Sequence, residues 1–80
     1  MKVAERYSAS LKKGVWYVAE ITCADPTGTM ESWFLFIRRV YADGRSEAVF
    51  NGDFDSLYHA KNAMKNWKKG LNWVTIRGQK

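Results

Sequence analysis

The 80-residue sequence has few of the residues that build covalent cross-links, metal sites or membrane spans. It contains one cysteine, Cys23, so no disulfide can form within the chain, and one histidine, His59. No CxxC, HxxxH, EF-hand or glycine-rich phosphate-loop spacing is present, so we expect no metal and no cofactor. The longest uncharged apolar run, residues 33–37, is far too short to cross a bilayer, and the first residues lack the apolar core of a signal peptide. These absences favour a cytoplasmic protein without membrane association.

Acidic residues are missing from the last third of the chain. Residues 1–55 carry seven basic and eight acidic groups, whereas residues 56–80 carry six basic groups and no acidic one. Such asymmetry points to an acidic partner, either nucleic acid or an acidic protein surface. The alternative is that a lysine-rich outer face keeps a small domain soluble.

Residues 54–73 have the pattern of an amphipathic helix. Apolar residues recur at spacings of three and four and so share one face; they are Leu57, Ala60, Met64, Trp67 and Leu71. The same spacing gives a second, basic face, the lysine stripe, which consists of Lys61, Lys65 and Lys68 with Lys69 beside it. Asp55 or Ser56 can cap the start of this helix, and Gly70 can end it in a left-handed conformation.

The chain before residue 54 has the alternation and the β-branched content of strands. Strands are expected at residues 3–11, 15–23, 32–41 and 46–51, with a long loop at 24–31 and a short last strand at 72–77. Asp43-Gly44 is typical of a tight hairpin turn. We place the first strand at an edge and the third centrally, because the third is apolar at nearly every position up to Ile37. The sequence therefore predicts one α+β domain over residues 1–80, a curved antiparallel sheet of four to five strands packed on one helix (β-β-β-β-α-β).

Residues that could support catalysis have simpler structural explanations. Asp53 and Asp55, two apart at a helix start, are typical of capping rather than of metal ligation. A Cys23–His59 dyad would supply a nucleophile and a base, but Cys23 ends an apolar strand, where a thiol is usually inert. Isolated carboxylates in different strands form no evident acid–base pair. We therefore expect a protein without enzymatic activity.

Aromatic residues are interleaved with arginines in the predicted strands. A sheet of this kind can stack bases on its rings and hold phosphates with its arginines. A small domain also needs several of these rings in its core, so we expect one to three of them on the open face. Besides the lysine stripe, the candidate binding residues are Arg38, Arg39, Arg45, Arg77 and Trp73.

A run of small motifs spans residues 41–67. It consists of Asp43-Gly44-Arg45, Gly52, Phe54-Asp55-Ser56, Ala60 and Ala63. This run resembles the arm-type DNA-binding domain of phage integrases, in which a strand, a DG turn, a second strand and a helix follow one another. In that family the sheet docks on DNA and the helix packs behind it, so the resemblance implies DNA binding. The match covers about a third of the chain, and the hairpin before it and the strand after it depart from the family's pattern.

Together these observations predict a small binding protein that is not an enzyme. The first hypothesis is nucleic-acid binding through the lysine stripe and the arginines and rings of the sheet. The alternative is a phage-type protein that binds and inhibits a host protein complex, because the small free-standing layout is similar to that of anti-CRISPR and other host-defence inhibitors. A homodimer through the edge strand or the open face is compatible with both.

Overall fold

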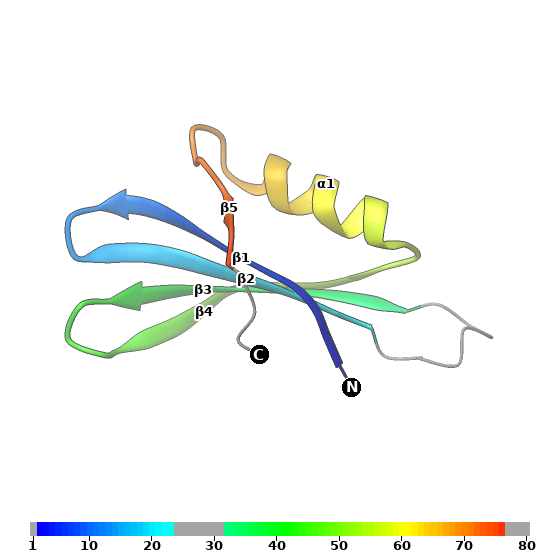
Figure 1. Ribbon diagram of the computed structural model, residues 1–80, viewed down its shortest axis with the longest axis horizontal. Coiled ribbons are helices and arrows are strands. Elements are labelled where there is room, and N and C mark those ends of the chain that lie inside the picture. The colour runs from blue at the N-terminus through cyan, green and yellow to red at the C-terminus, as the bar shows by residue number, and fades with distance from the viewer. Residues whose placement is uncertain (1, 24–31, 77–80) are drawn as a thin grey trace.

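The computed structural model describes residues 2–23 and 32–76, which form an antiparallel sheet packed against one helix (Figure 1). The strands are β1 (Lys2–Lys12), β2 (Val15–Cys23), β3 (Trp33–Tyr41), β4 (Ser46–Phe54) and β5 (Val74–Thr75), and the helix is α1 (Leu57–Trp67). Their order across the sheet is β4-β3-β2-β1-β5, and the sheet does not close on itself. The predicted fold class and the order β-β-β-β-α-β are therefore confirmed. The predicted loop at residues 24–31 lies outside the described residues.

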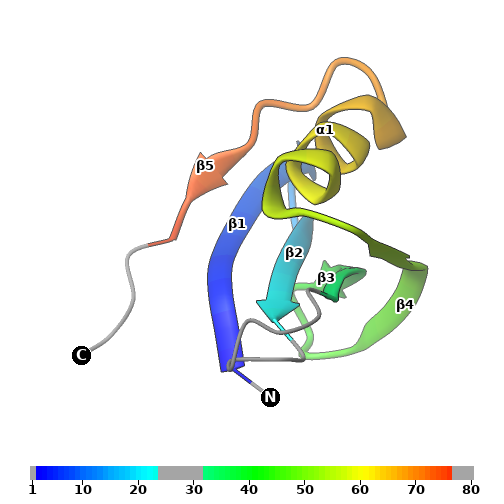
Figure 2. The same cartoon turned by 90° about the vertical axis from the view of Figure 1, so that its right-hand side faces the viewer.

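Every second residue of the inner strands faces the helix. Ala19 in β2 pairs with Tyr7 in β1 on one side and with Ile37 in β3 on the other, and all three are buried. The sheet curves around the helix, so this face is concave (Figure 2). The buried cluster contains Tyr7, Tyr17, Ala19, Ile21, Leu35, Ile37, Ala60 and Met64, with Leu57 and Trp67 packed against it. The predicted packing of the helix on the third strand is therefore confirmed.

The two hairpin turns lie side by side at one end of the sheet. Gly14 and Gly44 have φ angles of 79° and 97°, which glycine adopts without the steric cost that a side chain would add. The backbone N–H of Ala42 donates a 2.9 Å hydrogen bond to the carbonyl of Gly14, which ties the second turn to the first. Charged side chains of both hairpins therefore lie at this same end of the sheet, the hairpin end.

The helix begins later than the sequence pattern predicted. Strand β4 continues to Phe54 instead of stopping at residue 51, and Ser56 is the N-cap. The Ser56 Oγ accepts a 3.1 Å hydrogen bond from the backbone N–H of His59, which satisfies one free donor of the first turn. Of the two predicted caps, Ser56 rather than Asp55 takes the role.

The helix also ends earlier, at Trp67 rather than at Gly70. Lys68 is the C-cap and has extended backbone angles (φ −147°, ψ 120°), and Gly70 has a positive φ of 90° in the turn that follows. The placing of Leu71 on the apolar face of the helix was wrong, because Leu71 packs against the core from outside the helix. Lys68 and Lys69 are therefore not part of a helical stripe.

The edges of the sheet differ from the prediction as well. Strand β1 is not at an edge, because β5 pairs with it at Tyr7 and Ser8. Strand β3 has a neighbour on each side, as expected, but β2 is the middle strand. Strand β5 has two residues where six were predicted. No helix in residues 2–23 or 32–76 is long and apolar enough to span a membrane.

Candidate nucleic-acid interface

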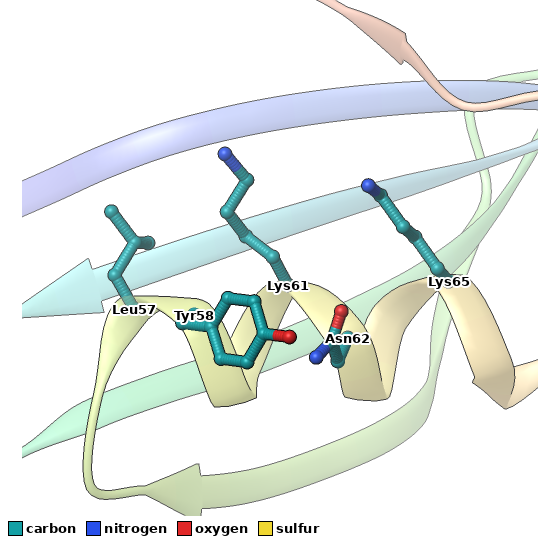
Figure 3. A pocket seen from close by; sticks show the side chains of 5 residues that line it. All are labelled: Leu57, Tyr58, Lys61, Asn62 and Lys65. Carbon is teal, nitrogen blue, oxygen red and sulfur yellow. The ribbon is translucent and has the colours of Figure 1, made fainter.

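The outer side of α1 carries an exposed aromatic ring next to two lysines. Tyr58 is 69% exposed. Helical spacing places Lys61 and Asn62 one turn further along, and Lys65 one turn beyond Lys61. Together with Leu57, these side chains line a shallow hollow of about 310 Å³, the helix hollow (Figure 3). A ring, a side-chain amide and two cations are thus available on one surface.

The amphipathic pattern of the helix explains why this ring is exposed. Ala60 and Met64 are buried against the sheet, so the positions that flank them turn toward solvent. The Tyr58 ring lies edge-on to the neighbouring His59 ring, with 5.8 Å between the centroids. Tyr58 is not among the binding residues predicted from the sequence, although its spacing of three and seven from Lys61 and Lys65 places it near the same face.

The structure divides the lysine stripe into paired and unpaired members. Lys61 Nζ lies 3.5 Å from Glu5 Oε1 in β1, so part of its charge is balanced. Lys65, Lys68 and Lys69 are exposed and form no ion pair within the described part of the chain. These three lysines are therefore the most available cations of the stripe.

Two of the predicted arginines lie at the hairpin end and are paired with carboxylates. Arg39 Nη1 lies 2.5 Å from Glu47 Oε2, and Arg45 Nε lies 2.8 Å from Asp43 Oδ2. Hydrogen bonds from Tyr41 and Arg39 lower the pKa of Glu47, and hydrogen bonds from the Arg45 backbone and side chain lower the pKa of Asp43. Both carboxylates are therefore charged at neutral pH and offset part of the positive charge.

Arg38 lies on the opposite face of the sheet from Arg39, as the alternation of a strand requires. It shares a carboxylate with a second arginine, since Glu20 Oε2 lies 2.9 Å from Arg6 Nε and 4.0 Å from Arg38 Nη2. The same face carries half-buried rings, namely Trp16, Phe34 and Phe36. The predicted arginines Arg38 and Arg39 therefore lie on opposite faces of the sheet.

Trp73 packs against the core. It contacts the buried cluster as a partly buried residue, and its Nε1 is buried without a hydrogen-bond partner among the described residues. This position favours packing over base stacking. Arg77, the remaining candidate, lies outside the described residues.

A second hollow, the hairpin hollow, lies between the end of α1 and the hairpin end of the sheet. It measures about 390 Å³ and is lined by Leu11, Lys12, Val15, Tyr17, Arg39, Tyr41 and Lys68. The Arg39 guanidinium lies over the Tyr17 ring at 5.6 Å, and that of Arg45 lies over the Tyr41 ring at 4.6 Å. Lys12 and Tyr41 are not among the binding residues predicted from the sequence, because only the tertiary fold brings them to Lys68.

Comparisons with family models, with curated proteins and with solved structures found no match to this chain. The resemblance to arm-type DNA-binding domains therefore stays a hypothesis. Among the described residues, no group of three or more His, Cys, Asp or Glu side chains is placed to hold a metal ion.

We expect Cys23→Ser and His59→Ala to leave the function of the protein intact, whichever binding partner the assay uses. His59 Nδ1 lies 3.0 Å from Ser56 Oγ, the atom that also accepts the His59 backbone hydrogen bond, so the ring belongs to the helix cap. The affinity of each variant can be measured by fluorescence anisotropy. A loss of function in both variants, with an unchanged circular dichroism spectrum, would show that the two residues act as a dyad.

Proposed function

We propose that the protein binds single-stranded nucleic acid along the outer side of α1 and catalyses no reaction. The observation that carries this proposal is the exposed Tyr58 ring beside Lys61 and Lys65 in the helix hollow. An unpaired base can stack on such a ring, and each stacked base contributes about 1–3 kcal/mol to binding. A base inside a duplex cannot present its face in this way, so the ring favours single strands.

The charge around this ring supports a phosphate backbone as the partner. Lys65, Lys68 and Lys69 are exposed and unpaired among the described residues, and they follow Lys61 along the chain. Lysines that contact phosphates release condensed counterions, which supplies much of the affinity for nucleic acid. Asn62, between the lysines, can donate to and accept from the edge of a base.

The proposal differs in one respect from what the integrase resemblance implies. In that family the sheet faces DNA, whereas here Arg39 and Arg45 of the sheet region are engaged by Glu47 and Asp43. Within the part of the chain that the structure describes, the helix lysines form no ion pair other than the contact between Lys61 and Glu5. Among the described residues, more of the unpaired positive charge therefore lies on the helix lysines than on these two arginines. This supports the helix side as the interface.

Binding of labelled single-stranded and double-stranded DNA and RNA at two salt concentrations tests the proposal. Tyr58→Ala should weaken single-strand binding by about 5- to 150-fold, which corresponds to the 1–3 kcal/mol of one stacked base. Tyr58→Phe is the matched control, because it keeps the ring and should bind like the wild type. The fold should survive both changes, since the side chain is 69% exposed.

Equal affinity for duplex and single strand, or no effect of Tyr58→Ala, would contradict the stacking role. No binding to any nucleic acid at low salt would end the proposal. Co-purification with a host protein that depends on the lysines would then favour the inhibitor hypothesis.

A further inference from the structure

The hairpin hollow gathers positive charge from three separate parts of the chain. Lys12 comes from the end of β1, Arg39 from β3, and Lys68 from the C-cap of α1. No carboxylate is among the described residues that line the hollow. Like charges that converge in this way repel one another, and an anion between them would relieve the repulsion.

The charges around this hollow match a phosphomonoester better than a phosphodiester. The carboxylate of Glu47 lies 2.5 Å from Arg39 and neutralises about one of the three positive charges that line the hollow. The C-terminal end of α1 adds only about half a negative charge. A phosphomonoester carries about −1.5 to −2 at neutral pH, whereas an internal phosphodiester in a nucleic-acid backbone carries a single negative charge.

Arg39 is held in place before any ligand arrives. Its guanidinium stacks over Tyr17, which is only 2% exposed, and it is bonded to Glu47, which also accepts a 2.9 Å hydrogen bond from the Tyr41 hydroxyl. Hydrogen bonding to Tyr17, Tyr41 and Glu47 raises the pKa of Arg39, so the group stays charged. A preorganised guanidinium loses little side-chain entropy on binding phosphate. The volume of about 390 Å³ also lies within the range of small-ligand sites.

The hollow lies at one end of the path that the helix lysines mark. Lys61 contacts Glu5 near the start of β1, and Lys68 lines the hollow together with Lys12 at the end of the same strand. Lysines 61 and 65 project to the same side of the helix (Figure 3). A backbone that passes Lys65 on the exposed side of α1 therefore reaches the hairpin hollow at Lys68, three residues further along the chain.

We propose that the hairpin hollow binds the terminal phosphate of a nucleic-acid strand whose backbone follows Lys61 and Lys65. This inference rests on the proposed function, and it adds a preference for phosphorylated strand ends. Lys12, Arg39 and Lys68 hold the phosphate oxygens, and no covalent step is involved.

The test compares one single-stranded oligonucleotide with no terminal phosphate, with a 5′ phosphate and with a 3′ phosphate. At about 50 mM salt, one of the two phosphorylated forms should bind wild-type protein roughly tenfold more tightly than the unmodified strand. Lys12→Gln should remove this preference and leave the affinity for the unmodified strand within about twofold. Lys13→Gln is the matched control: Lys13 is exposed in the same turn, carries the same charge and does not line the hollow. It should keep the preference.

Equal affinity for all three oligonucleotides would overturn the inference while leaving the proposed function intact. Equal loss of the preference in the Lys12 and Lys13 variants would overturn it too, because general charge would then be the cause. Both positions are exposed, and circular dichroism can confirm that the variants fold.

Discussion

Trp67→Ala is expected to lower the free energy of unfolding by about 3–5 kcal/mol. The Trp67 ring meets the buried Tyr17 ring edge-on, with 5.1 Å between centroids, and packs against the core at the last turn of α1. Truncation removes this contact and leaves a cavity between the helix and β2, which the rigid sheet cannot fill. A domain of this length has roughly 4–12 kcal/mol of total stability, so much of it would be lost.

Urea denaturation followed by circular dichroism measures this effect, because fluorescence would change with the loss of a tryptophan. Trp67→Phe keeps an aromatic ring against Tyr17 and should lose distinctly less stability. Lys65→Ala, on the exposed side of the same helix, should have little effect. A denaturation midpoint that Trp67→Ala leaves unchanged would contradict the packing of the helix on the sheet.

Local patterns were sufficient to predict the elements and the core. Residues 15–23 alternate between buried and half-buried positions over their first seven residues, and the predicted strand has the same bounds as β2. The end of the helix was not predictable in this way. Leu71 faces the core from a loop. Apolar spacing indicates that a residue faces the core, but it does not indicate whether that residue is part of the helix.

The site was predictable only where it depends on local spacing. The lysines of α1 follow from the helical repeat. The pairing of Arg39 with Glu47 instead depends on the register of β3 and β4, which shifts at an irregularity between Ile37 and Arg38. The hairpin hollow depends on the contact between the two turns at Gly14 and Ala42, which joins segments far apart in the sequence. No local signal specifies either feature.

Changing Lys61, Lys65 and Lys68 to Gln should decrease nucleic-acid binding and make it less sensitive to salt. Each lysine that contacts a phosphate of a single strand contributes about 0.7 to the slope of log affinity against log salt, so the triple variant should lose about 2 units. The weakening should be similar for all sequences, because phosphate contacts carry no base information. Anisotropy titrations at four or more salt concentrations give the slope directly.

The triple Gln variant should remove positive charge without unfolding the protein. Lys65 and Lys68 are exposed and Lys61 is half-buried, and Gln is a fair helix former, so the fold should survive. Lys61 should contribute less to the salt slope than Lys65 and Lys68 if its contact with Glu5 persists in the complex. The three single Gln variants can show this difference. Changing the same three lysines to Arg keeps their charge and should keep the salt slope. A triple Gln variant that binds with the wild-type slope would place the phosphate backbone elsewhere on the protein, and the helix side would no longer be the interface.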